Sequence, residues 1–162
     1  MKLVSMIITI AVAMGMACSQ VSDNLALPVN DVEEIESAYY SNYPEEGEIT
    51  KKITSRQEFD IEWDKTHEGM SPTPELPIVD FEERDVILLM LETKPTGGYG
   101  IDHYEILTNS DQFIIRFAES HPGEQCGTTQ ALTRPYKFIS IPKSDKEIVF
   151  QKGKTVFHNC GA

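Results

Sequence analysis

Seven residues of this chain carry thiol or imidazole groups, the side chains that most often act as nucleophiles, bases or metal ligands. They are Cys18, Cys126, Cys160, His67, His103, His121 and His158. Catalysis would require one of them beside an oriented partner, and a zinc site would require about four convergent ligands. The sequence contains no nucleophile elbow, phosphate-binding glycine loop, paired-histidine zinc motif or regular calcium loop. It therefore predicts a non-enzymatic protein with no cofactor and no metal site.

A disulfide is the predicted use of Cys126 and Cys160. Cys126 lies in a Gly/Thr-rich segment without the neighbouring cations that activate a thiol. An even number of cysteines in an exported chain favours a bridge. Closing a loop of this length stabilises a fold by about 3–4 kcal/mol on the chain-entropy model. The alternative is that the two cysteines are reactive thiols or metal ligands.

Cys18 has a different context, at the end of an apparent export signal. Lys2 precedes an apolar run from Leu3 to Met14, and Ala17 is a small residue directly before the cysteine. This order resembles a bacterial lipoprotein signal, in which the thiol is acylated and the chain is cleaved before it. The run is shorter than the about 20 residues that span a bilayer. We expect a signal peptide over 1–17 and lipidation of Cys18, with simple secretion as the alternative because Gly15 replaces the usual leucine.

The net charge of the chain limits the kinds of partner that it can bind. Without residues 1–17 the chain loses only Lys2, leaving 13 basic against 26 acidic residues, a net charge of −13. A nucleic-acid partner is therefore excluded, and attachment to a membrane would depend on the acyl chains. Residues 18–50 have the composition of an acidic linker, disordered over 19–30 and possibly including a first strand. The predicted location is the bacterial cell envelope, lipid-anchored and facing the periplasm or the surface.

The rest of the chain, residues 51–162, forms one predicted β-rich domain with a helix near its start. Residues 55–58 form a capping box, and Phe59 and Trp63 follow on one helical face, so we expect a helix over about 55–67 that covers a sheet. Residues 86–91 are a continuous apolar run, typical of a central strand buried on both faces.

Further strands are predicted by β-branched and aromatic residues at spacing two. They lie at 99–107, 112–119 and 128–141, the first two forming a hairpin, with a closing hairpin from 148–150 and 155–157. The predicted fold is mainly β, an immunoglobulin-like sandwich or a small barrel-like antiparallel sheet.

Three loops could form a binding surface. The first is Lys94-Pro95-Thr96-Gly97-Gly98-Tyr99, in which two glycines leave backbone amides unshielded. The second spans 121–127, and the third contains Arg134-Pro135-Tyr136, where proline interrupts a strand pattern. Arginine and tyrosine dominate many protein interfaces, so this break predicts a binding site. The alternatives are a tight turn at 94–99 and a buried Tyr136 with Arg134 paired to a carboxylate.

Over residues 55–142 these motifs resemble the PrcB C-terminal domain family. The resemblance rests on residues 76–81, the following apolar strand, Pro95-Thr96-Gly97-Gly98-Tyr99 and Arg134-Pro135-Tyr136, and the helix with Trp63 agrees with it. It implies a small lipoprotein-borne β domain that associates with a secreted protease as a complex subunit and helps it mature or persist.

A more distant similarity links the three loops to chagasin-type inhibitors of cysteine proteases. Those immunoglobulin-like domains present an Asn-Pro-Thr-Thr-Gly-Tyr loop, a Gly-rich loop and an Arg-Pro-Trp loop. In this chain Lys94 stands in place of Asn, Gly97 in place of the second Thr and Tyr136 in place of Trp.

The preferred hypothesis is a protein-binding domain whose three loops meet at one end of the sandwich and contact a secreted protease. Lys94, Pro95, Thr96, Gly97, Gly98, Tyr99, Arg134, Pro135 and Tyr136 are its predicted contact residues. The alternatives are a chagasin-like inhibitor and a structural envelope lipoprotein without a protease partner.

Overall fold

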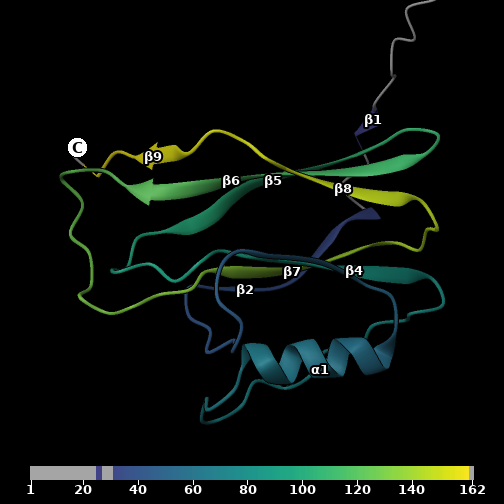
Figure 1. The fold of residues 1–162 in the computed structure, drawn as a ribbon, viewed down its shortest axis with the longest axis horizontal. Helices are drawn as coiled ribbons and strands as arrows, with labels where there is room; N and C mark the ends of the chain where they lie inside the picture. The colour runs from purple at the N-terminus through teal and green to yellow at the C-terminus, as the bar shows by residue number, and fades with distance from the viewer. Residues whose placement is uncertain (1–24, 27–30, 161–162) are drawn as a thin grey trace, which may run out of the picture.

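In the computed structural model, residues 25–26 and 31–160 form three stacked layers, two β-sheets and a helix (Figure 1). The outer sheet contains β1 (Leu25–Ala26), β5 (Gly100–Thr108), β6 (Gln112–Pro122) and β8 (Glu147–Lys152) in that order, with β9 (Val156–His158) also beside β6. The middle sheet has the order β2 (Glu33–Ala38), β7 (Tyr136–Pro142), β4 (Arg84–Met90) and β3 (Ile49–Ile53). Helix α1 (Arg56–Thr66) covers the free face of the middle sheet. The predicted signal peptide and Cys18 lie outside the described residues.

Helix α1 begins where the sequence predicts. The backbone N–H of Glu58 donates to the Ser55 side chain at 3.3 Å, and the Glu58 carboxylate accepts from the backbone N–H of Thr54 at 3.0 Å. Phe59 and Trp63 both pack on Phe138 of the middle sheet, with ring centroids 5.6 and 5.4 Å from it. The helix therefore covers a sheet, as its apolar spacing indicates.

Strand β4 lies inside the middle sheet and is buried on both faces. Val86, Leu88 and Met90 join the core under α1, while Ile87, Leu89 and Leu91 join the core between the two sheets. Successive side chains of a strand point to opposite faces, so a continuous apolar run serves two cores at once. This confirms the central strand predicted at 86–91.

The fold is an open β-sandwich, which confirms the predicted mainly β class and selects the sandwich over a barrel. Strands β5 and β6 form the predicted hairpin. At its turn, the Asn109 side chain accepts from the backbone N–H groups of Asp111 and Gln112, both at 2.9 Å. The segment predicted as a linker supplies β2 and the start of β3 to the middle sheet.

The closing hairpin predicted at 148–157 is wrong. Strands β8 and β9 both run parallel to β6, as one interrupted strand along its edge. The break at Gly153 does not reverse the chain, because its N–H donates to the Phe117 carbonyl of β6 at 2.8 Å. Gly153 also lacks the positive φ that a two-residue hairpin turn requires. Similarly, the strand predicted at 128–141 begins only at Tyr136.

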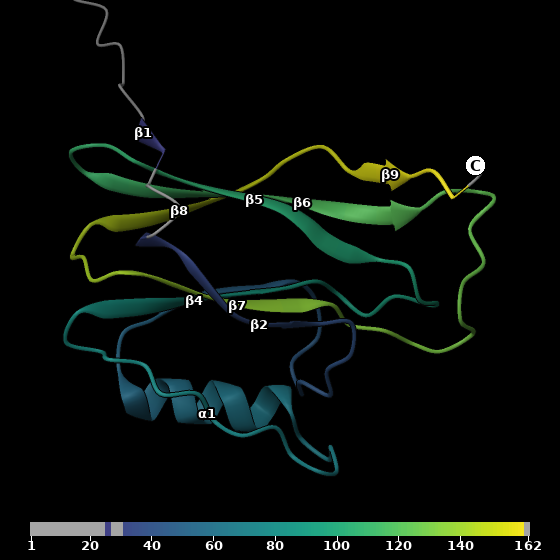
Figure 2. The ribbon, with the colours of Figure 1, turned by 180° about the vertical axis from the view of Figure 1, so that it is seen from behind.

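One end of the sandwich collects several connections that are distant in sequence. The segments 39–48, 91–99 and 123–135 lie there with β9 and the C-terminus, at the left of Figure 1 and the right of Figure 2. We call this region the loop end. Within the part of the chain described, no helix is long and apolar enough to cross a membrane.

Candidate protein-binding site

The three predicted loops meet at the loop end. Lys94 and Thr133 exchange backbone hydrogen bonds of 2.7 and 3.0 Å, which join the first loop to the third. The Tyr99 ring lies 4.9 Å from the His121 ring, centroid to centroid, which joins the first loop to the second. Convergence, the geometric condition for a shared binding surface, is satisfied.

Gly97 and Gly98 allow this packing between loops. A Cβ on Gly97 would overlap the Thr129 hydroxyl, and one on Gly98 would lie 2.9 Å from Pro122 Cβ. Gly98 also has φ of +88°, a conformation that glycine adopts without strain. The Gly97 N–H donates to the Thr129 carbonyl at 3.0 Å, so this amide is used inside the fold rather than offered to a partner. The role of the two glycines is therefore to let the loops pack closely, rather than to present backbone amides to a partner.

Lys94 is a buried member of an ion-pair network instead of a surface contact. Its ammonium pairs with the buried carboxylate of Glu119, which also lies 3.0 Å from Lys152 Nζ and 2.7 Å from His121 Nε2. Burial alone would raise the pKa of Glu119, but hydrogen bonds from Lys94, Lys152 and His121 lower it to about 2. Burial opposes the charge on Lys94 too, yet its bonds with Glu119 and Glu92 raise its pKa.

The ion pairs of Glu119 predict that the folded protein loses stability in acid. A carboxylate with a lowered pKa stabilises the fold above its unfolded pKa of 4.5, and that contribution disappears as the pH falls towards about 2. The difference corresponds to at most about 3 kcal/mol. We expect Glu119→Gln to be less stable than wild type at neutral pH and to lose less stability on acidification, as measured by urea unfolding at several pH values. Glu124→Gln, an exposed carboxylate of the loop end, is the control, and equal acid losses in wild type and Glu119→Gln would contradict the prediction.

Arg134 and Tyr136 require a correction, because neither presents its side chain at the surface. Arg134 is 5% exposed and Tyr136 2% exposed. The Arg134 guanidinium donates to the carbonyls of Leu91, Tyr43 and Gly47, at 3.2, 2.6 and 2.9 Å. Tyr136 begins β7 with its ring in the core under α1, and its hydroxyl lies 2.8 Å from His67 Nε2.

Pro135, between them, is also buried, and its carbonyl accepts from the Leu91 N–H at 2.9 Å. The interruption in the strand pattern therefore marks an internal anchor of the loops. Of the predicted contact residues, Pro95 and Gly98 are exposed and Thr96 and Tyr99 half-buried.

The exposed apolar surface of the loop end comes mostly from residues outside the predicted set. Tyr39 is 66% exposed and Phe157 69%, and Tyr40, Leu132 and Val156 are also exposed. The Phe157 ring packs at 5.5 Å on His121, which itself contacts Tyr99. The adjacent tyrosines at 39 and 40 could have indicated this exposed surface from the sequence. Phe157 could not, because the sequence predicts it in a closing hairpin that the structure does not form.

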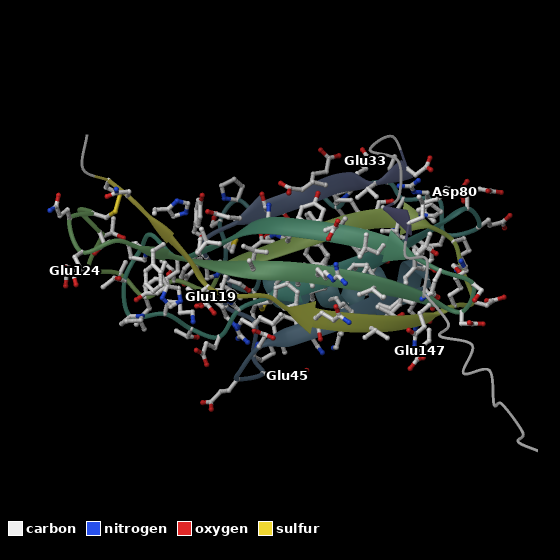
Figure 3. The ribbon with its side chains drawn as sticks, turned by 90° about the horizontal axis from the view of Figure 1, so that it is seen from above. Glu33, Glu45, Asp80, Glu119, Glu124 and Glu147 are labelled. Carbon is white, nitrogen blue, oxygen red and sulfur yellow. A yellow bond between two sulfur atoms is a disulfide. The ribbon has the colours of Figure 1, made fainter. Side chains whose placement is uncertain are left out.

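A disulfide between Cys126 and Cys160 holds this surface together and confirms the predicted bridge. It joins the second loop to Cys160, two residues after the end of β9, as the yellow bond at the left of Figure 3 shows. The labelled Glu124 lies at the same end of the molecule, whereas Glu33, Asp80 and Glu147 lie at the opposite end. The bridge therefore fixes the C-terminal arm, with Phe157, beside the three loops.

A groove of about 400 Å³ opens between these elements. Its lining includes the rings of Tyr39 and Tyr99 and the polar residues Asp102, Ser120 and His158. Serine, histidine and aspartate are the residue types of a hydrolase triad, but the Ser120 hydroxyl is buried and has no hydrogen-bond partner within the described chain. The nucleophile–base contact of a triad is therefore not made among the described residues. In residues 25–26 and 31–160, no three acidic, histidine or cysteine side chains are placed to hold a metal ion.

Comparison with known proteins agrees with the motif resemblance. No curated protein and no solved structure matches the chain. The matching family model starts at residue 86, so it includes most of β4, strands β5 to β7 and the three loops but not helix α1. The predicted resemblance is thereby confirmed over a shorter span than 55–142: residues 86–142 match the family described as PrcB C-terminal.

Proposed function

We propose that this protein binds a secreted protease through its loop end and acts as a non-enzymatic subunit or stabiliser of that protease. The observation that carries the proposal is the cluster of exposed apolar side chains at the loop end. Tyr39 lines the groove, and Tyr40, Leu132, Val156 and Phe157 belong to the segments that meet at that end. The other large hydrophobic side chains exposed in the described residues, Leu25, Ile61 and Ile78, are separate in sequence from this cluster. Exposed apolar side chains gathered at one end of a domain are typical of a protein interface. The match to the PrcB C-terminal family supports a protease complex as the setting.

We favour a role in which the protein associates with the protease over one in which it blocks the active site of the protease. A chagasin-like mechanism would use the Arg-Pro-Tyr segment as an exposed wedge, but its arginine and tyrosine are internal supports here. The surface available to a partner is the groove, which Tyr39 and Tyr99 line, together with the exposed Phe157 at the same end. We therefore propose that the protein prolongs the life of the protease rather than inhibiting it.

The proposal also includes a location for the protein at the cell envelope. An acylated Cys18 would tether the domain to the cell envelope, and the partner would then be a protein of the same exported compartment. Lipidation itself is tested by the mass of the processed N-terminal peptide.

The binding test compares two variants of the full processed chain used as bait for envelope and extracellular proteins of the producing bacterium. Tyr39→Ala/Phe157→Ala removes the two most exposed aromatic rings at the loop end. We expect it to recover a peptidase at least about tenfold less well than wild type, because two truncated interface anchors cost more than about 1.4 kcal/mol. Recovery is measured by mass spectrometry and by cleavage of a protein substrate.

Ile78→Ala is the matched control, because Ile78 is fully exposed near the opposite end of the sandwich. We expect it to recover the peptidase as wild type does. The purified domain should then slow the inactivation of that peptidase without lowering its initial rate. The proposal fails when the double variant and wild type recover the same proteins, or when no peptidase is recovered by either.

A further inference from the structure

The disulfide between Cys126 and Cys160 joins two segments that neither core of the protein includes. Among the described residues, the two cores contain nothing between 118 and 135 and nothing after Phe150. The bridge therefore restrains segments at the surface. Opening it would leave the packing of both sheets and of helix α1 in place.

The bridge is accessible from solvent. Cys160 is exposed and Cys126 is half-buried. The tip of the second loop beside Cys126 consists of Glu124, Gln125 and Gly127, which are all exposed. An external thiolate can reach a disulfide in such a position without unfolding of the domain. A bridge enclosed by a core lacks this access.

The C-terminal arm, residues 153–160, has few other attachments to the domain (Figure 2). Strand β9 pairs with β6 over three residues, and at one of them Pro122, which has no N–H to donate, lies opposite His158. Phe157 contacts the His121 ring edge-on. Every residue of the arm is exposed. A short strand that buries so little surface belongs to the least stable part of a fold.

The same arm supplies part of the surface that is proposed to bind the partner. His158 lines the groove and pairs with Asp102, which lines it too. Phe157 is one of the exposed rings of the loop end. A Cβ on Gly123 would overlap the His158 carbonyl, so the arm lies directly against the turn that carries Cys126. Release of the arm would take a lining residue of the groove and an exposed ring with it.

From these observations we propose that the Cys126–Cys160 bridge is a thiol-exchange site, at which a dithiol reductant of the exported compartment opens the bridge and releases the arm from the loop end. Release of the arm ends partner binding, and this consequence rests on the proposed function. Reoxidation of the two cysteines returns the arm and restores binding.

The exchange takes place in two steps. A thiolate of the dithiol attacks Cys160 Sγ, a new S–S bond forms, and Cys126 leaves as a thiolate that takes a proton from water. The second thiolate of the dithiol then attacks the dithiol sulfur of this mixed disulfide, and Cys160 leaves as a thiolate and is protonated. The bridge gains two electrons and two protons, and the dithiol loses the same number and becomes a cyclic disulfide.

The first test treats the processed protein with dithiothreitol and counts thiols by mass after maleimide labelling. We expect the native protein to be reduced at a rate within about tenfold of that of the urea-unfolded protein. A bridge that opened only in unfolded molecules would be reduced more than about a thousandfold more slowly, because folded molecules of a stable domain outnumber unfolded ones by at least that factor. That slow rate would overturn the inference. Cys126→Ser/Cys160→Ser is the control for labelling at Cys18.

The second test locates the change in the molecule. Hydrogen exchange is compared between the oxidised protein and protein that has been reduced and alkylated, so that the bridge cannot close again. We expect the amides of β9 to lose protection by at least about tenfold while those of β4 keep theirs. Unchanged protection of β9 would overturn the inference. An equal loss in β9 and β4 would also overturn it, because the whole domain would then have unfolded.

The third test connects the site to binding. The reduced and alkylated protein should recover at least about tenfold less peptidase than the oxidised protein, and protein that is reduced and then reoxidised should recover as much as wild type. Equal recovery after release of the arm would overturn the effect on binding, while Tyr39→Ala/Phe157→Ala tests the loop end independently. If no form recovers a peptidase, the proposed function fails, and the reduction rate and the protection of β9 decide the thiol-exchange site alone.

Discussion

Replacing Arg134 by alanine is expected to lower the free energy of unfolding by about 3–5 kcal/mol, a large fraction of the stability of a domain this size. The guanidinium supplies hydrogen bonds to three carbonyls, those of Leu91, Tyr43 and Gly47. Leu91 and Tyr43 are buried, and each buried carbonyl left without a donor costs about 1–3 kcal/mol, whereas Gly47 is exposed and its carbonyl can bond water. These carbonyls belong to two different connections of the loop end, so both should loosen together.

The measurement is denaturant unfolding, with Arg56→Ala as the matched control. Arg56 is an exposed helix residue paired with Asp60 at 2.6 Å, and removing such a surface pair costs at most about 1 kcal/mol. Arg134→Lys should fall between the two, because an ammonium cannot reach three divergent carbonyls with the fixed geometry of a guanidinium. The structural role assigned to Arg134 is wrong if Arg134→Ala is as stable as Arg56→Ala.

Replacing Cys160 by serine is expected to cost about 3–4 kcal/mol of stability and to weaken partner binding. The bridge closes a loop with a sequence separation of 34, which restricts the unfolded chain. The binding effect has a different cause. All three residues of β9 are exposed, so the arm that carries Phe157 buries little apolar surface and depends on the bridge for its position.

Two measurements distinguish these effects. Urea unfolding reports the stability loss, and hydrogen exchange at the amides of β9 against those of β4 reports local release of the arm. We expect the amides of β9 to lose protection far more than those of β4 in Cys160→Ser, and peptidase recovery to fall as it does for Tyr39→Ala/Phe157→Ala. Cys126→Ser/Cys160→Ser controls for the thiol left behind and should behave as the single variant does. Unchanged protection of β9 would mean that strand pairing alone holds the arm.

These two variants illustrate that residues of the loop end have two different roles: some support the loops, and others contact a partner. Arg134, Lys94 and Gly97 are internal and hold the loops together. Tyr39, Leu132 and Phe157 project from that support and are free to contact a partner. An interface built in this way loses affinity when an exposed ring is truncated, but loses its shape when an internal support is removed.

Much of the fold followed from local patterns in the sequence. The capping box at Ser55 predicted the start of α1, and the apolar run at 86–91 predicted a strand buried on both faces. The turn at Asn109 predicted the β5–β6 hairpin, and the cysteine count predicted the bridge. Each of these signals acts over a few residues or through a covalent bond, so it does not depend on the path of the whole chain.

The errors arose where a long-range partner overrode a local preference. Gly153 between two short apolar segments favours a hairpin turn, but parallel pairing of both segments with β6 keeps the chain running in one direction. Arg134-Pro135-Tyr136 was read as an exposed contact because the same residue types serve interfaces and internal anchors. Only the carbonyls of the 39–48 and 91–99 segments, which lie distant in sequence, show that the arginine is satisfied inside the fold.

The amino-acid sequence by itself therefore determined the mainly β class, the helix, the bridge and the three segments that meet at one end. The export signal stays a prediction. The tertiary structure decided which side chains at that end reach the solvent. The physical reason is that burial depends on strand register and on neighbours from other parts of the chain. Composition names the residues able to bind a partner, but only the packed structure separates Tyr39 and Phe157, which are exposed, from Arg134 and Tyr136, which are not.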